Sequence, residues 1–519
     1  MKQDTLKLLN TALQLHHNGK LNEADEIYQL ILKSDKNNFD ANHLHGLVLS
    51  QNKKYEDSLI FFKKALELNN NFEINNNIGI AYKNLKDYKL AEKYFINAIN
   101  LDKNNYKSYF NCANLYHDNS EYKKAIEYYE KALECNQEFE ESYLKISEVY
   151  KELFQNTKPR NEVHLMNSKK YLSKLLRLNP NHTGAYISLG MTQLWLKQIE
   201  DANNSFNQAV KLDQNNPHVI ETYINKYAND INSLKTIIKH EYEQLSYLIE
   251  KYNISENDDF DKEYYQSIEM LHSKINTARF NTNTPSIEFK QKLFKIRYKK
   301  NPDISEKNLI NLKNNINNVE NEYLNSNPEI LVLDNFLDDD ALILLRKYCN
   351  EANIFKYAFH NGYVGSFLTK GLSNHFILKL SEDLRKTFTK IFTNLVLTQA
   401  WIFKYDSKRL GTGIHADQAT VNVNFWITEN ESNLDSSGGG LVLWDKIPPQ
   451  EWSFNEYNSV DSSSKIEKML SQEKINKQVI EYKENRAVIF NSKLFHATDN
   501  FHFKDNHVDR RLNITFLYD

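Results

Sequence analysis

The sequence predicts a multidomain α + β protein: an N-terminal helical solenoid, a helical linker and a C-terminal domain of short β strands. Three observations lead to this expectation. A self-similar period of about 34 residues fills residues 1–215. The pattern stays helical but loses that period over residues 216–325, and β-like segments separated by turn signals replace it over residues 326–519. We therefore expect three domains with these boundaries.

Six copies of one pattern carry the period of the first domain. One column holds a small residue in every copy, at steps of 34, 33, 34, 43 and 34 residues, and an insertion at residues 154–163 accounts for the long step. This column consists of Ala24, Ser58, Ala91, Ala125, Ser168 and Ala202. A second column, in the preceding helix of each copy, consists of Ala12, Gly46, Gly79, Ala113, Ser147 and Gly190.

A period near 34 residues with helix–turn–helix content resembles the tetratricopeptide repeat, or TPR. Small residues let neighbouring helices approach closely, while Tyr82, Tyr116 and Tyr150 are expected to fill the space between repeats. Because each repeat buries its apolar face only against its neighbours, the expected architecture is a solenoid.

Solenoids offer a concave surface, and its usual partner is a protein or peptide segment. Counting from the small-residue column predicts which polar side chains face that surface. They are Asn76, Lys83, Asn114 and His117, and Asn77 and Asn111 are two further candidates for binding a partner. Asn77 and Asn111, one repeat apart, could pair with a peptide backbone; the alternative is that all six are solvated polar positions.

Composition excludes several classes of protein. A formal charge of −3 argues against a nucleic-acid partner. The cysteines, Cys112, Cys135 and Cys349, offer neither a disulfide framework nor a zinc cluster, which suits a reducing compartment. No apolar run approaches the ~20 residues that a membrane span needs. We expect a cytoplasmic protein.

The character of the chain changes after Pro328. The segment EILVLDNFL is typical of a strand, and TVNVNFWIT, RAVIFN and RRLNITFLYD are later β-like segments. Several short strands in a domain of this length favour a β-sandwich or a small barrel of the jelly-roll type.

A candidate metal site begins at the turn before the segment TVNVNFWIT. His415 and Asp417 lie two residues apart, so they project on the same side of an extended segment. A lone His-x-Asp is weak support, because composition alone produces roughly one in such a chain. Here the pair is followed by His496, after the strand RAVIF, and by Arg511 at the start of the final strand. That ordered set is much rarer than the triplet.

The ordered set resembles the iron(II)- and 2-oxoglutarate-dependent dioxygenases, and their prolyl-hydroxylase-like branch in particular. The resemblance implies a double-stranded β-helix in which His415, Asp417 and His496 hold Fe(II) and leave the opposite coordination face open to 2-oxoglutarate and O₂. It also implies hydroxylation of a C–H bond, with succinate and CO₂ as products.

Side-chain alternation chooses between two arginines for the far carboxylate of 2-oxoglutarate. Arg511 shares one face of the last strand with Asn513 and Thr515, whereas Arg510 shares the other face with apolar residues. An arginine fork binds a carboxylate through two hydrogen bonds. The resemblance also places Arg511 in this role, together with Tyr405. The candidates for binding the co-substrate are Arg511, Tyr405, Asn513 and Thr515.

The distal histidine has a rival. His502 lies closer to Arg511 than His496 does, and it can replace His496 as the distal ligand. His496 is preferred because it follows the end of a strand after a short turn. A second triplet, His507-Val-Asp509, is excluded because too few residues follow it to supply a further ligand and an arginine.

Three other features of the β domain can each be interpreted in two ways. Tyr405 is either a co-substrate contact or a packed core residue. The glycines at residues 438–440 either let the backbone approach the site closely or form a hairpin loop. The long insert at residues 446–478 is either a lid or a substrate-recognition element.

The expected function is an oxygenase that hydroxylates a substrate, namely a protein side chain recruited by the TPR array. Two alternatives stay open. One is an oxygenase that acts on a small molecule or a glycan precursor, and the other is a non-catalytic TPR scaffold with a relic β domain. The sequence identifies neither the hydroxylated residue nor the oligomeric state.

Overall fold

The structure is a computed structural model that describes residues 2–256, 260–297, 299, 301–302, 307–407, 411–459, 462–473 and 475–519. The chain divides into two compact units, Met1–Pro180 and Asn181–Asp519. The described part of the first unit is helical, and the second combines helices with two antiparallel sheets. The division falls before the sixth predicted repeat, whereas the sequence placed a boundary after it, at residue 215.

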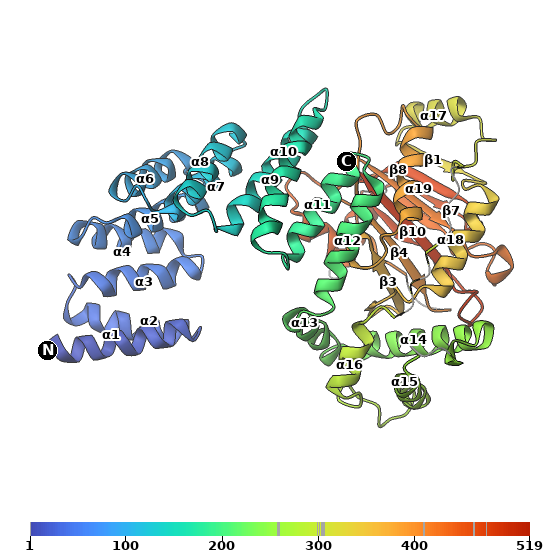
Figure 1. Ribbon diagram of the computed structural model, residues 1–519, viewed down its shortest axis with the longest axis horizontal. Coiled ribbons are helices and arrows are strands. Elements are labelled where there is room, and N and C mark those ends of the chain that lie inside the picture. The colour runs from blue at the N-terminus through green and yellow to red at the C-terminus, as the bar shows by residue number, and fades with distance from the viewer. Residues whose placement is uncertain are drawn as a thin grey trace. The chain divides into compact units, whose positions relative to one another are not determined.

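In the first unit each helix packs against the next along the chain (Figure 1). Asparagine side chains begin several of these helices: Asn38, Asn71 and Asn105 each accept a hydrogen bond from a backbone N–H of the first turn. The helices are α1 (Lys2–His17), α2 (Leu21–Ser34), α3 (Phe39–Gln51), α4 (Tyr55–Leu68), α5 (Phe72–Asn84), α6 (Tyr88–Leu101), α7 (Tyr106–Asp118), α8 (Tyr122–Cys135), α9 (Glu140–Asn156) and α10 (Glu162–Leu178).

The small-residue columns leave room for buried aromatic rings. Every member of the first column is fully buried. At Gly79 an added Cβ would lie 2.6 Å from the ring of Phe95, and at Gly46 it would lie 2.7 Å from the ring of Phe62. Because the ring already occupies that space, a glycine in one helix lets the aromatic residue of the next helix pack directly against its backbone.

The sixth repeat packs on the β region. It consists of α11 (Thr183–Trp195) and α12 (Ile199–Asp213). The indole of Trp195 donates to the carbonyl of Leu397 (2.8 Å), and Lys370 pairs with Asp213 (2.5 Å). α12 also contacts α19 (His375–Thr387). These contacts place the last repeat in the second compact unit.

Further helices of the second unit surround the sheets (Figure 1). Among them α14 contacts β2 and β3, and a buried ion pair joins its Glu241 to Lys356 (2.5 Å). The remaining helices are α13 (Pro217–Ala228), α14 (Ile231–Tyr252), η1 (Ile254–Glu256), α15 (Lys262–Lys274), α16 (Ile287–Phe294), α17 (Ile316–Asn325), α18 (Asp339–Glu351), η2 (Leu368–Lys370), η3 (Asn430–Ser432), α20 (Phe454–Asn458) and α21 (Ser462–Gln472). No described helix has both the length and the apolar character that a membrane crossing requires.

The strands form one large and one small antiparallel sheet. The large sheet has the order β1-β8-β5-β10-β4-β3-β2, and the small sheet has the order β7-β6-β9. The strands are β1 (Ile330–Leu333), β2 (Tyr357–Phe359), β3 (Tyr363–Phe367), β4 (Leu397–Tyr405), β5 (Val421–Trp426), β6 (Leu441–Trp444), β7 (Lys477–Ile480), β8 (Ala487–Asn491), β9 (His496–Thr498) and β10 (Leu512–Tyr518).

The two faces of the large sheet differ in character. On β10, Phe516 packs against Phe425 of β5 on the apolar face. On the other face Thr515 lies opposite Asn424 of β5 and Trp401 of β4. A buried apolar cluster joins this second face to residues of the small sheet. The polar side chains of β5 and β10 therefore line the space between the two sheets.

Candidate metal centre

Three side chains that the sequence singled out converge between the sheets. His415 and Asp417 lie in the segment that connects β4 to β5, and His496 begins β9. The two histidines form an antiparallel bridge: the N–H of His415 donates to the carbonyl of His496 (3.0 Å), and the N–H of His496 donates to that of His415 (2.8 Å). One side-chain nitrogen or oxygen from each of the three lies within 4.8 Å of the others. Within the described ranges this is the only such group of His, Cys, Asp or Glu.

Backbone carbonyls orient both imidazoles. Nδ1 of His415 lies 2.7 Å from the carbonyl of Gly413, and Nδ1 of His496 lies 2.9 Å from that of Leu494. A carbonyl only accepts, so each Nδ1 carries a proton, and in the neutral form of each ring the lone pair is on Nε2. Those Nε2 atoms lie 4.0 Å and 3.4 Å from the carboxylate oxygens of Asp417. Two Nε2 atoms and a carboxylate that face one another could hold a cation between them, and metal-binding histidines are often oriented by carbonyls in this way.

The protonation states also suit a metal. Burial, and then the neighbouring His496, lower the pKa of His415, which favours the neutral ring that a metal requires. Burial alone would raise the pKa of Asp417, but the hydrogen bond from His496, the charges of the two histidines when they are protonated and the hydrogen bond from Asn422 together lower it below its usual value. Nδ2 of Asn422 donates to the carboxylate of Asp417 (2.9 Å) and holds it in place.

Arg511 is a buried cation that forms no ion pair with a carboxylate among the described residues. It is 1% exposed, and it donates to the carbonyls of Gly439 (2.6 Å) and Gly440 (3.1 Å). Its guanidinium lies over the ring of Tyr405, 4.9 Å from the ring centre. Nη1 is buried and has no hydrogen-bond partner within the described chain. Burial lowers the pKa of Arg511, yet arginine stays charged in proteins, so an anionic ligand would supply the missing partner.

The glycines at residues 438–440 bring the backbone close to neighbouring strands. A Cβ at Gly440 would lie 1.7 Å from the carbonyl oxygen of Ile480, and one at Gly438 would lie 2.4 Å from that of Asn500. Gly439 has a positive φ of 89°. Of the two interpretations, the structure favours close backbone approach, because a Cβ at Gly438 or Gly440 would clash with a neighbouring backbone carbonyl, and the carbonyls of Gly439 and Gly440 accept hydrogen bonds from Arg511.

A row of amides that the sequence analysis did not single out lies beside Asn513 and Thr515. Asn424 and Asn513 both donate to the hydroxyl of Thr515 at 3.2 Å. The buried Oδ1 atoms of Asn422 and Asn424 have no hydrogen-bond partner in the described part of the chain. The alternation of Val and Asn in VNVNFW was the signal that could have found this row, since it turns both amides toward one face.

Two cavities reach the cluster. The inner cavity, of about 30 Å³, is lined by all three candidate ligands and by Tyr405, Asn513 and Thr515. The outer cavity, of about 480 Å³, is lined by His415 and Asp417 and otherwise by aromatic, aliphatic and uncharged polar residues. Its aromatic walls are Tyr363, Phe367, Trp401, Phe403 and Phe454. Among the described residues that line it, Asp417 alone is acidic, and none is a lysine or an arginine.

The insert at residues 446–478 contributes to the wall of the outer cavity. It contains α20 and α21, and Phe454, Asn458 and Ser463 line the cavity. Nδ2 of Asn458 donates to the carbonyl of Ala416 (2.7 Å). Ile466 belongs to an apolar cluster with Ala416. The insert therefore packs directly on the segment that carries His415 and Asp417.

The rival histidines lie elsewhere. His502 is not part of the cluster; its carbonyl accepts a hydrogen bond from the N–H of Leu434 (2.7 Å). His507 is buried with its Nε2 3.3 Å from Nζ of Lys404. The geometry thus groups His496 with His415 and Asp417.

Arg510 faces away from Arg511, as side-chain alternation predicts, but it is not a free surface residue. It is 3% exposed and pairs with Glu243 of α14 (2.6 Å) and with Asp406 (3.4 Å). The sequence pattern could not reveal these partners, because Glu243 lies far away along the chain.

The polar side chains expected on the concave surface of the repeats are engaged within the array. The expectation for Asn76 needs correction: it is only 7% exposed, and its amide donates to Ser108 (2.8 Å). The other pairs are Asn77 with His43 (2.8 Å), Lys83 with Asp118 (2.9 Å), Asn111 with Asn76 (3.5 Å), Asn114 with Tyr129 (2.6 Å) and His117 with Glu152 (3.0 Å). Most of these partners are one repeat apart, because stacking brings equivalent positions side by side.

Comparison with known proteins identifies the repeats. Residues 39–72 and 70–138 each match the tetratricopeptide repeat. These residues therefore form tetratricopeptide repeats, as the period predicted. No curated protein sequence matches the chain.

Several solved structures resemble part of the chain. MamA protein is 22% identical, with 35% of this chain and 94% of that chain covered and a TM-score of 0.30. Pseudomonas aeruginosa pilF is 16% identical over 41% and 92% of the two chains, with a TM-score of 0.35. YrrB, a TPR protein with an unusual peptide-binding site, is 20% identical over 37% and 94%, with a TM-score of 0.29.

Proposed function

We propose that the second unit is an Fe(II)- and 2-oxoglutarate-dependent oxygenase of the double-stranded β-helix fold, and that it hydroxylates a protein side chain recruited by the TPR array. The observation that carries this proposal is the pairing of two features between the same sheets. One is a His-Asp-His cluster in which Nδ1 of each histidine faces a backbone carbonyl and the two Nε2 atoms face the carboxylate. The other is Arg511, a buried cation that has no carboxylate partner in the described part of the chain.

The donor set fits Fe(II). Two neutral imidazoles and one carboxylate from His415, His496 and Asp417 match the ligand preference of non-haem iron and leave several coordination positions free. When bound, Fe(II) supplies the site at which a 2-oxo acid and O₂ react. The candidate ligands are themselves held in position by hydrogen bonds to Asn422 and to the carbonyls of Gly413 and Leu494.

Arg511 and Tyr405 fit the far carboxylate of 2-oxoglutarate. The guanidinium is already oriented by the carbonyls of Gly439 and Gly440, and its unpaired Nη1 remains available to an anion. The inner cavity of about 30 Å³ holds one water-sized group. A five-carbon diacid therefore requires side chains that line this cavity to move, and its binding should change the fluorescence of Trp401, which lines the same cavity.

The outer cavity fits an uncharged substrate group. Its lining lacks lysine and arginine among the described residues, so an anionic side chain would enter without a counter-ion, and its one acidic residue, Asp417, is a proposed metal ligand. Aromatic walls can contact C–H groups, and Asn361, Gln399 and Asn458 can hydrogen-bond a peptide or an amide. The same walls exclude water from the reacting C–H bond.

Recruitment by the TPR array follows from what such arrays do, since they bind protein segments. The alternative of a small-molecule substrate predicts that turnover is independent of the repeats. A variant that lacks residues 1–180, the first compact unit, separates the two: a protein substrate should lose most of its turnover, whereas a small molecule should not.

Mass spectrometry of captured partners tests the proposal. Partners bound to the full chain should gain the mass of one oxygen atom when Fe(II), 2-oxoglutarate and O₂ are supplied, and the Asp417→Ala chain should yield none. Succinate release should accompany this gain. If the intact protein neither binds Fe(II) nor consumes 2-oxoglutarate, the oxygenase proposal fails and the TPR scaffold remains.

A further inference from the structure

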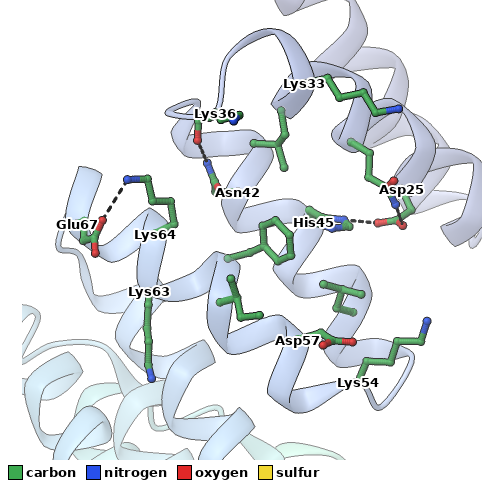
Figure 2. A pocket seen from close by; sticks show the side chains of 15 residues that line it. Asp25, Lys33, Lys36, Asn42, His45, Lys54, Asp57, Lys63, Lys64 and Glu67 are labelled. Atoms are coloured by element: carbon green, nitrogen blue, oxygen red, sulfur yellow. Dashed lines mark hydrogen bonds and ion pairs between the residues drawn. The ribbon is translucent and has the colours of Figure 1, made fainter.

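A groove of about 800 Å³ lies on the repeat array between the first and second repeats (Figure 2). Leu32, Leu49, Ile60 and Phe61 provide its apolar lining, and Ile60 is 64% exposed. Lysines surround this lining, as Figure 2 shows for Lys33, Lys36 and Lys54. All lining residues come from α2, α3, α4 and the turns beside them.

The groove opens where a column of tyrosines is interrupted. Tyr82, Tyr116 and Tyr150 each stand three residues after the small residue of their helix, and Leu49 holds the equivalent position after Gly46. A leucine lacks the ring that fills this position in the next three repeats. The space that those rings occupy is therefore left open in the second repeat.

Ring contacts in the other repeats show what is missing. Tyr82 stacks on Tyr94 with ring centres 5.7 Å apart, and Tyr116 lies 5.1 Å from Tyr128. Phe61 holds the position of Tyr94 and Tyr128, three residues after its own small residue. It has no tyrosine opposite it. Its ring meets His45 edge-on at 4.3 Å and is otherwise half-buried in the groove.

The charges around the groove are unbalanced. Five lysines line it against three acidic residues. Two of the acids are engaged, Asp25 with His45 (2.5 Å) and Glu67 with Lys64 (3.2 Å). In the described part of the chain Lys33, Lys36 and Lys54 form no ion pair with an acidic residue.

We propose that this groove is a docking site for an acidic protein segment that inserts one aromatic side chain against Phe61. The inserted ring would complete the pair that Leu49 leaves open, and Asp or Glu side chains on either side of it would meet Lys33, Lys36 and Lys54. The site lies on different residues from the six predicted for the concave surface. It is independent of the oxygenase proposal, because it uses the repeats alone.

Fluorescence anisotropy with a short labelled peptide tests this proposal on the full chain. The probe carries Glu and Asp around one central Trp. Two control peptides replace either the Trp by Ser or the acidic residues by Lys. The parent peptide should bind, its affinity should fall with added salt, and both controls should bind at least about tenfold more weakly.

Variants locate the binding. Leu49→Tyr restores the missing ring, so the array should keep its thermal stability. The affinity for the peptide should fall about tenfold or more, because the new ring occupies the groove. A double change of Lys33→Glu and Lys54→Glu should weaken it by a similar factor, whereas Lys123→Glu, an exposed lysine on α8, should not. The double change also tests the site if Leu49→Tyr fails to fold.

Three outcomes would overturn the proposal. The first is a peptide affinity that neither Leu49→Tyr nor the double lysine change reduces. The second is equal binding of the peptide with Ser in place of Trp, since the ring then has no role. The third is complete displacement of the peptide by polyphosphate or by phosphatidylserine vesicles of the same total charge, which would mark a general polyanion surface.

Discussion

The repeat array and the sheet unit differ in the surroundings of their buried polar groups. In the array the polar side chains near the helix interfaces find partners one repeat away, such as His117 with Glu152 and Asn77 with His43. In the sheet unit Arg511 and Asn424 keep buried atoms without a partner in the described chain. A buried polar atom that lacks a partner costs free energy, so it marks a place where a ligand completes the structure.

The difference follows from how each region is built. A solenoid brings equivalent positions side by side at every repeat, so one local pattern can pair polar side chains in several repeats. The space between two sheets collects side chains from strands that are far apart in the sequence. Polar groups in such a site can lack hydrogen-bond partners within the protein and can be paired instead by a bound ligand.

The largest effect is expected at the metal cluster. His415→Ala, Asp417→Ala or His496→Ala should abolish stoichiometric Fe(II) binding, because each removes one of three protein ligands. Anaerobic calorimetric titration of the full chain measures this. His502→Ala is the matched control and should bind iron as the parent does. Full iron occupancy in Asp417→Ala would refute the assignment of this cluster as the Fe(II) site.

A large loss of stability is expected inside the array, with no change in Fe(II) binding by the second unit. Phe95→Ala removes a fully buried ring that packs on Gly79 and should cost about 3–5 kcal/mol in the unfolding of the first unit. Chemical denaturation followed by circular dichroism measures it, and Tyr94→Phe serves as a mild control. A parallel fall in Fe(II) affinity would show that the two regions are not independent.

Arg511→Ala should leave Fe(II) binding unchanged but lower the affinity for 2-oxoglutarate. A charge-assisted pair in an enclosed site is worth about 2–4 kcal/mol, which corresponds to a roughly 30- to 1000-fold rise in KM. Arg511→Lys should recover little, because an ammonium cannot reproduce the fork.

Arg510→Ala is the control for this prediction. It should lower the melting temperature, since it leaves Glu243 buried without its partner, and it should leave the KM for 2-oxoglutarate unchanged. An unchanged KM in Arg511→Ala, or a larger KM effect at Arg510, would defeat the co-substrate assignment.

Lys404 gives the sheet unit a distinct pH dependence. Burial, and then Arg510, lower the pKa of Lys404 to about 7 from 10.5. Between these values the unfolded chain binds a proton that the folded chain lacks, so stability should rise as pH increases from about 7 to about 10.5. Lys404→Met should flatten much of this rise. It should also stabilise the unit at pH 7 by about 1–3 kcal/mol, less than the full shift implies, because Asn350 loses a hydrogen bond.

Denaturant melts across this pH range check the prediction for Lys404. Lys356, whose pKa burial lowers to about 8, contributes a smaller rise that the variant should retain. A parent whose stability falls between pH 7 and pH 10 would contradict the assignment of this slope to buried lysines.

The smallest effect is expected on the outside of the array. Lys83→Met breaks the pair with Asp118 (2.9 Å), of which the carboxylate side is half exposed, and should cost under about 1 kcal/mol. Thermal melts at low and high salt measure it, and the difference should vanish at high salt. A loss of several kcal/mol in the free energy of unfolding would mean that polar pairs between neighbouring repeats, rather than the buried rings, stabilise the array.

The sequence by itself determined the features that depend on local periodicity. The repeat period and its small residues predicted the tetratricopeptide repeats that the comparison confirms over residues 39–138. Alternation along the last strand placed Asn513 and Thr515 on one face before any fold was known. These predictions succeed because a helix or strand fixes the direction of a side chain from its spacing alone.

Only the tertiary structure decided which distant residues meet. It brought His496 rather than His502 to His415, gave Arg510 its acidic partner on α14, and placed the sixth repeat in the same compact unit as the sheets. It also turned Asn76 inward, where counting from a small-residue column expected an exposed side chain. Such contacts join positions far apart in the chain, and their partners depend on how whole elements pack, which no local spacing encodes.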